Sequence, residues 1–127
     1  MASNICQRLQ QDVWKSYANG LSEAPTSEGI YAIGFLESVP PGVLNVKTIY
    51  VGQTNNIHRR LREHKYQNLK IDDFVKSQFN LDGGKYLMIK WVEERNYKCQ
   101  EGNYLNCMNN NLGYWPSFNR KRGDTCN

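Results

Sequence analysis

Two short apolar runs, each carrying a tyrosine and together followed by a basic segment, constrain the fold of this chain more than any other feature. The first run is 29–36 (GIYAIGFL) and the second is 48–52 (TIYVG), with Pro-Pro-Gly at 40–42 between them. Both runs are rich in β-branched and aromatic residues, which favour strands, and the Pro-Pro-Gly tripeptide is typical of a turn. The sequence therefore predicts a hairpin that brings Tyr31 and Tyr50 onto neighbouring strands.

A helix is predicted directly after this hairpin, beginning at Asn55 or Asn56, since either side chain can accept a hydrogen bond from a free backbone N–H. Residues spaced i, i+3, i+4 and i+7 mark the face that a helix turns inward. In this helix they are Ile57, Arg60, Leu61 and His64. An arginine on a packed face costs several kcal/mol unless it is paired or lines a wet cleft. A phosphate-binding cleft would meet that need. The alternative is that Arg60 and His64 reach past the helix end and make ordinary surface contacts.

Three further elements follow from periodicity. A helix over residues 3–19 would carry a stripe ending at Tyr17 and stop at Gly20. A second helix, with apolar residues from Ile71 to Phe79, would end at 83–84 (Gly-Gly). Residues 85–93 alternate as a strand that is buried on much of both faces. The fold class is thus α+β, with a three-stranded antiparallel sheet flanked by helices.

The strands of this sheet are expected to begin near Ile30, Thr48 and Lys85. At 127 residues the chain has room for one core, so we expect a single domain over 1–127, with the helix of residues 1–20 packed on it. The interval between Tyr31 and Tyr50 exceeds a tight hairpin. We expect its excess to be a surface excursion that touches substrate.

The last predicted helix, about Asn96 to Asn109, places a carboxylate among apolar residues. Its inward stripe is Tyr97, Glu101, Tyr104, Leu105 and Met108. A carboxylate that faces a core must be paired or bind a cation, and its hard oxygen atoms suit Mg²⁺. A salt bridge between Glu101 and Arg60 is the alternative that the spacing leaves open.

Composition narrows the class of protein. The four cysteines show neither C-x-x-C spacing nor a zinc-site pattern, which indicates free thiols in a reducing compartment. No signal peptide or membrane-length apolar run is present, so we expect an intracellular protein, cytoplasmic or nuclear, with no membrane partner. The net charge of +4 is modest. The cations gather in two clusters, which suit a polyanion or else form solvated faces. They are Arg59, Arg62 and Lys65 in the basic helix and Arg120, Lys121 and Arg122 near the C-terminus.

The tyrosine motifs and the basic helix resemble those of the GIY-YIG nucleases. Gly29-Ile30-Tyr31 matches the first motif, and Tyr50-Val51-Gly52 matches the second with valine in place of isoleucine. Arg60 and His64 match the helix arginine and the histidine that follows one turn later. The resemblance covers about residues 29–119, and the closing Gly-Asp-Thr-Cys is similar to the end of the nuclease domain in some homing enzymes.

The resemblance implies further residues and an activity. Glu101 would be the metal-binding glutamate and Asn119 the C-terminal asparagine of the family. The chain would then be an endonuclease that uses Mg²⁺ or Mn²⁺ to hydrolyse DNA phosphodiesters. Its catalytic residues would be Tyr31, Tyr50, Arg60, His64, Glu101 and Asn119. The alternative is a catalytically inactive nucleic-acid-binding module on the same scaffold. No targeting domain is apparent, so either specificity is low or a partner protein or a separate domain supplies it.

Overall fold

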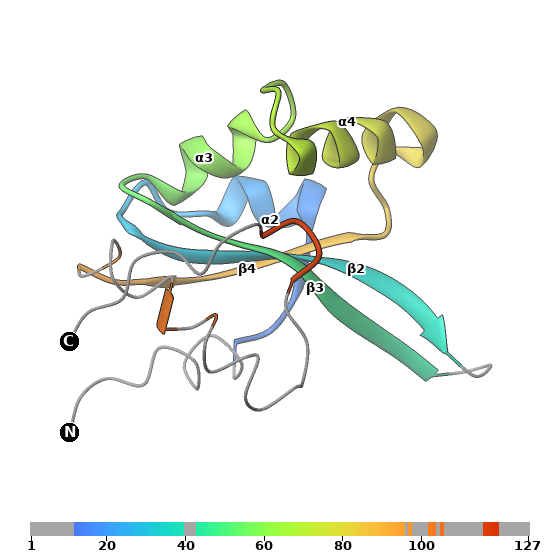
Figure 1. Cartoon of the computed structure of the whole chain (residues 1–127), viewed down its shortest axis with the longest axis horizontal. Helices are drawn as coiled ribbons and strands as arrows, with labels where there is room; N and C mark the ends of the chain where they lie inside the picture. Colours follow the sequence, from blue (N-terminus) through green and yellow to red (C-terminus); the bar gives the residue numbers. More distant parts are fainter. Residues whose placement is uncertain are drawn as a thin grey trace.

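The computed structural model describes residues 12–39, 43–95, 97, 102, 103, 105 and 116–119. In chain order its elements are β1 (Lys15–Ser16), α2 (Tyr17–Glu23), β2 (Gly29–Val39), β3 (Val43–Thr54), α3 (Ile57–Glu63), α4 (Lys70–Asp82) and β4 (Leu87–Glu93). The strands form one antiparallel sheet in the order β1-β4-β2-β3. Figure 1 shows α2, α3 and α4 together on one face of this sheet. The α+β class and the antiparallel sheet are confirmed, with one more strand than the sequence predicted.

The hairpin of β2 and β3 is longer than the predicted one. The two strands pair from Gly29 opposite Thr54 as far as Val39 opposite Val43, so the residues expected to form a surface excursion continue the ladder instead. β-branched residues such as Val46 and Thr48 favour strands, which agrees with pairing beyond the tyrosine motifs. Only the predicted turn at 40–42 lies outside the described residues.

The N-terminal helix differs from the prediction in its described part. Lys15 and Ser16 pair with β4 as a short edge strand, and α2 begins only at Tyr17, where the Ser16 side chain accepts from the Asn19 N–H at 3.3 Å. Gly20 does not end the helix but lies inside it, where the Cβ of any other residue would crowd Lys15 and Ile89. The cap and the strand pairing together outweigh the helical periodicity of this segment. The rest of the predicted helix lies outside the described residues.

Helix α3 begins where the sequence predicted, and its first turn is held by several bonds. The Asn56 side chain accepts from the Arg59 N–H at 2.9 Å, while the N–H groups of Ile57 and His58 donate to loop carbonyls at 3.0 and 2.9 Å. These bonds satisfy donors that a helix start leaves unpaired. Ile57 and Leu61 are fully buried on the sheet, as the predicted stripe requires.

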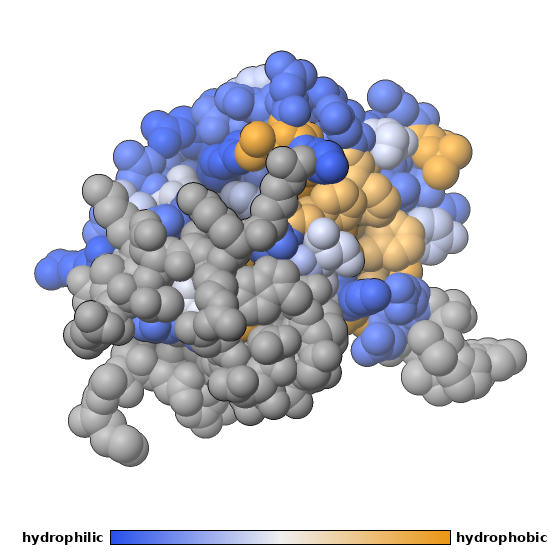
Figure 2. Space-filling model, viewed as in Figure 1, coloured by the Kyte–Doolittle hydropathy of each residue, from blue (hydrophilic) through white to orange (hydrophobic). Residues whose placement is uncertain are grey.

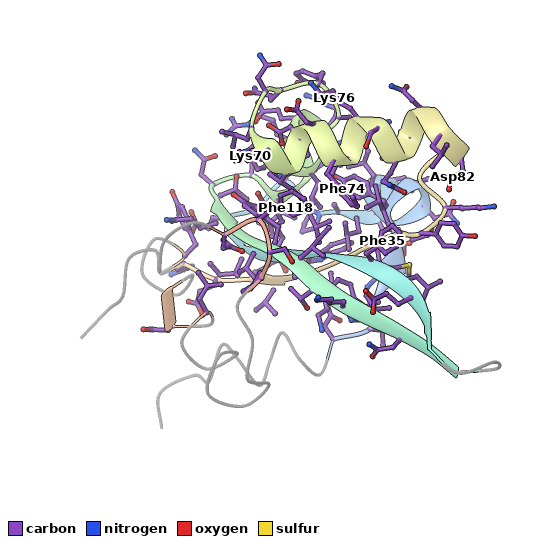
Figure 3. The ribbon with its side chains drawn as sticks, turned by 45° about the vertical axis from the view of Figure 1, so that its right-hand side comes forward. Phe35, Lys70, Phe74, Lys76, Asp82 and Phe118 are labelled. Atoms are coloured by element: carbon purple, nitrogen blue, oxygen red, sulfur yellow. The ribbon has the colours of Figure 1, made fainter. Side chains whose placement is uncertain are left out.

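Helix α4 also follows its prediction, and it ends at Gly83, whose φ of +75° suits a residue without Cβ. Its Phe74 points toward the sheet between Phe35 of β2 and Phe118 of the C-terminal segment, as Figure 3 shows, with ring centroids 5.8 and 5.3 Å away. Aromatic pairs at such distances add to burial. The contact holds segment 116–119 between α4 and the outer strand.

Segment 116–119 runs beside β3 through backbone bonds. The Phe118 N–H donates to the Ile49 carbonyl at 2.9 Å. Of the predicted last helix, residues 97, 102, 103 and 105 are described as helical, and Leu105 is fully buried. Glu101 and the four cysteines lie outside the described residues. Among the residues that the structure describes, no helix has the length and apolar character to cross a membrane.

Candidate active site

Tyr31 lies at the centre of the sheet, and its position depends on a glycine of the neighbouring strand. It pairs with Gly52 in the β2–β3 ladder, and residues opposite each other in an antiparallel pair point to the same face. A Cβ at Gly52 would overlap the Tyr31 ring and its hydroxyl. The second tyrosine motif therefore carries glycine because the tyrosine of the first motif lies across that position.

We predict that Gly52→Ala lowers any activity that depends on Tyr31 by about 100-fold, since a displacement of roughly 1 Å is enough for such a loss. The added methyl group would also cost about 1–3 kcal/mol of stability. Gly83→Ala is the control, because its Cβ would meet open space and only its positive φ causes strain. Both variants should melt earlier, as thermal unfolding measures. Equal activity losses in the two variants would contradict this role of Gly52.

The Tyr31 hydroxyl begins a chain of buried hydrogen bonds that crosses from the sheet into two helices. Its oxygen lies 2.6 Å from Nε2 of His64, at the C-terminal end of α3. Nδ1 of His64 bonds in turn to Oδ1 of Asp72, in the first turn of α4. Oδ2 of Asp72 accepts from the Leu69 N–H at 2.9 Å. Tyr31, His64 and Asp72 have no exposed surface.

The charge states along this chain follow from its surroundings. Burial lowers the pKa of His64, with Asp72 acting in the opposite direction, so the imidazole is neutral at pH 7. Burial acts to raise the pKa of Asp72. The bonds from His64 and from the Leu69 N–H outweigh it, and the net shift is downward. Asp72 is therefore a carboxylate that can only accept hydrogen bonds. Consequently Nδ1 of His64 carries the proton and donates it to Asp72, while Nε2 accepts from the Tyr31 O–H.

Tyr50 and Arg60 flank this chain and are partly exposed. The Tyr50 ring lies 5.5 Å from the His64 ring and 6.2 Å from the Tyr31 ring, measured between centroids. Arg60 lies one turn before His64 on α3, 19% of its side chain is exposed, and its Nη1 is 3.8 Å from Oε1 of Glu63. Its positive charge acts on both His64 and Asp72. The structure thus gathers four of the six predicted catalytic residues.

Asn119 has a visible structural role. Its side-chain oxygen accepts from the Val51 N–H at 2.8 Å, and its side-chain nitrogen donates to the Val51 carbonyl at 2.9 Å. This amide completes the hydrogen bonds of β3 beside Tyr50, so Asn119 ties the C-terminal segment to the strand that carries the second tyrosine. Its family role as a catalytic residue stays a prediction.

Of the predicted DNA-binding residues, those on the basic helix are exposed. Arg59 and Arg62 lie on α3 and Lys65 just after it, where the surface is hydrophilic (Figure 2). The Arg59 guanidinium donates to the Asn55 side chain at 2.6 Å, and Lys65 lies 4.7 Å from the Phe79 ring centroid. The predicted residues Arg120, Lys121 and Arg122 lie outside the described part of the chain.

The described residues do not form a metal site by themselves. Among them no group of three or more His, Cys, Asp or Glu side chains could hold a metal ion. Asp72 is the carboxylate bonded to His64, and both of its oxygens already accept hydrogen bonds. A magnesium ion needs only one or two carboxylates beside phosphate oxygens and water. Glu101 lies outside the described residues, so its role as the metal ligand stays a prediction.

The structure thus brings the two tyrosines of an antiparallel hairpin together with the arginine and histidine of the helix that follows. The family model described as the GIY-YIG catalytic domain matches residues 28–106, and the chain therefore belongs to the GIY-YIG nuclease family. Comparisons with curated proteins and with solved structures find no match.

Sequence reasoning missed Asp72. The prediction of its helix rested only on the apolar residues from Ile71 to Phe79. One signal was present: an acidic residue in the first turn of a helix suits the free N–H groups there. That signal does not reveal the second bond, which Asp72 accepts from Nδ1 of His64, because only the folded chain brings the end of α3 to the first turn of α4.

Proposed function

We propose that the protein is a divalent-metal-dependent endonuclease that hydrolyses DNA phosphodiester bonds. The observation that carries the proposal is the buried bond of 2.6 Å between the Tyr31 hydroxyl and Nε2 of His64. A phenol with the usual pKa of about 10 is a poor base near pH 7 unless its own proton can leave. A neutral imidazole beside the hydroxyl gives that proton a place to go.

In the reaction, Tyr31 takes a proton from the attacking water while its own proton passes to Nε2 of His64. The water oxygen bonds to phosphorus, the bond to the leaving sugar oxygen breaks, and that oxygen takes a proton from solvent. The imidazolium later returns its proton to solvent. Because Tyr31 is fully buried in the free protein, the water has to reach it from the side of the partly exposed Tyr50 and Arg60.

Arg60 and Tyr50 would act on the phosphate. The guanidinium of Arg60 would stabilise the negative charge that develops in the transition state, as a positioned cation does in a site with little water. The hydroxyl of Tyr50 would orient the water or a phosphate oxygen. Glu101 would hold the metal ion, which supplies Lewis-acid polarisation of the phosphate when bound.

A nicking assay on supercoiled plasmid tests the proposal. The purified chain should convert plasmid to nicked and linear forms with Mg²⁺ or Mn²⁺, and excess chelator should stop the conversion. Retention of plasmid on a gel without cleavage under any divalent metal would indicate the inactive binding module instead. If the chain neither cleaves nor binds the plasmid, both functions are rejected.

Sequence-independent binding to the DNA backbone is expected from the cations beside the site. Phosphate contacts release counterions, so each contact adds about one unit to the slope of log K against log salt. Replacing Arg59, Arg62 and Lys65 together by glutamine should flatten that slope by about 2 to 3 and weaken binding to unrelated sequences alike. Fluorescence anisotropy over a salt series measures it.

The matched control removes the same charge elsewhere, as Lys15→Gln, Lys85→Gln and Arg95→Gln combined, and should leave the slope nearly unchanged. A loss confined to one DNA sequence would instead mark the residues of the basic helix as base readers. Specificity for a cleavage site would come from a partner protein or from a separate targeting domain, since contacts of this kind carry no sequence information.

A further inference from the structure

Asp72 makes two hydrogen bonds where a helix start needs one. In the first turn of α4, one carboxylate oxygen accepts from the Leu69 N–H at 2.9 Å, which satisfies a free donor of the helix start. Such a bond is ordinarily made at the surface, yet Asp72 has no exposed surface and turns its other oxygen to His64. Burying a carboxylate is costly, so this second bond needs a reason beyond capping.

The groups around the His64 ring come from four elements. Arg60 and Glu63 lie on α3, Asp72 on α4, Tyr31 on β2 and Tyr50 on β3. Tyr17 on α2 acts on the neighbouring Asp72 and donates to the Leu61 carbonyl at 2.5 Å. Burial raises the pKa of Tyr17, which stays neutral. Arg60 opposes a positive charge on His64, whereas Asp72 and Glu63 favour one. Within the described part of the chain, Asp72 is the charged group that bonds directly to the ring.

This arrangement decides which way a proton can move. Because the carboxylate accepts only, it keeps the His64 proton on Nδ1 and leaves the lone pair of Nε2 facing the Tyr31 hydroxyl. When Nε2 takes the Tyr31 proton, the imidazolium that forms lies in a buried site against a carboxylate, which stabilises it. Without that carboxylate, burial and Arg60 would both oppose the transfer.

We propose that Asp72 is a positioning residue of the nuclease site, which holds His64 in the tautomer that accepts the Tyr31 proton. The proposal rests on the proposed function and adds a residue to it. Asp72 touches neither substrate nor metal in this scheme. Asp72 acts through His64, which lies between Asp72 and Tyr31 in the chain of hydrogen bonds.

Asp72→Asn tests the proposal at nearly constant side-chain size. If the amide oxygen accepts from the Leu69 N–H, the amide nitrogen faces Nδ1 of His64, which must then accept. The ring proton moves to Nε2, and Tyr31 can no longer pass its proton there. Cleavage at pH 7 should fall about 100-fold or more, in line with the loss of general-base assistance, while DNA binding stays within about twofold.

The neighbouring Asp73→Asn is the matched control. It removes the same charge from the same helical turn, but the Asp73 side chain is 67% exposed and pairs with Lys76 at 3.3 Å. Exposed pairs of this kind contribute little. This variant should keep its cleavage rate within about threefold. Similar losses in both variants would show an effect of charge or helix capping and would overturn the proposal.

Two readouts separate positioning from a purely structural role. In Asp72→Asn the Tyr31 proton has to leave to solvent, so the cleavage rate should rise about tenfold per pH unit from 7 toward the phenol pKa of about 10. The wild-type rate should be flat over the same range. A flat profile in Asp72→Asn would contradict the proposal.

The second readout is the ¹⁵N resonances of the His64 ring, which report the tautomer without any DNA or metal. The wild-type protein should show the proton on Nδ1 and Asp72→Asn should show it on Nε2. A wild-type ring with its proton on Nε2 would overturn the proposal even if the variant fails to fold. A correct tautomer in a protein that never cleaves DNA would instead reject the proposed function and keep the role of Asp72 at His64.

Discussion

Tyr31→Phe is expected to lower the rate of DNA cleavage by about 10²- to 10⁴-fold, the range that a positioned general base contributes. The substitution keeps the ring that packs across Gly52 and removes only the oxygen bonded to His64. Water then has no protein group to take its proton. Single-turnover cleavage of a labelled duplex at saturating enzyme measures the loss apart from binding.

The same change leaves Nε2 of His64 buried without its hydroxyl partner, which should cost about 1–3 kcal/mol of stability, so activity must be compared well below the melting temperature. Tyr86→Phe is the control, since that ring is 40% exposed, and it should cleave at the wild-type rate. DNA affinity should be unchanged in both variants. A Tyr31→Phe protein within tenfold of wild type would remove Tyr31 from the chemistry.

Glu101→Ala is expected to reduce cleavage to the level that the wild-type protein shows without divalent metal. The reason is that a hard cation requires an oxygen ligand from the protein, and Glu101 is the residue to which we assign this role. DNA binding without metal should stay within about twofold, because the phosphate-binding cations remain. The nicking rate with Mn²⁺ measures the first expectation, and fluorescence anisotropy of labelled DNA in excess chelator measures the second. Calorimetric titration of Mn²⁺ then measures the loss of metal binding itself.

Glu23→Ala removes an exposed carboxylate from α2 and serves as the control for the lost charge. Arg60→Ala gives a useful contrast. It should lower cleavage by about 10²- to 10³-fold, as the loss of one charge-stabilising group does, and it should also weaken binding. Full activity in Glu101→Ala would reject the metal assignment, and the salt bridge between Glu101 and Arg60 would then become the better reading of that residue.

Local signals were sufficient for several elements of the fold. Asn56 caps α3 where the sequence predicted, because the start of a helix favours a side chain that accepts a hydrogen bond. Gly83 ends α4 as predicted, because a position with positive φ favours glycine. The β-branched and aromatic runs around Tyr31 and Tyr50 likewise indicated two strands. These features depend on residues within a few positions of one another, which is why a single sequence reveals them.

Pairing between distant strands determined two features of the sheet that the sequence did not predict. The edge strand of Lys15 and Ser16 exists because β4 offers it a ladder, and the same segment would otherwise read as a helix. Likewise the hairpin extends to Val39 and Val43 through bonds between strands, although the tyrosine motifs alone suggested a shorter one.

The candidate site shows the same division. From the sequence, the resemblance to the GIY-YIG motifs implied that the tyrosine pair and a helix with Arg60 and His64 belong together. Only the tertiary structure placed Asp72 against His64 and the Tyr31 ring across Gly52. Both contacts join segments whose approach depends on how the helices and strands pack, and no periodicity within one element encodes a contact with another.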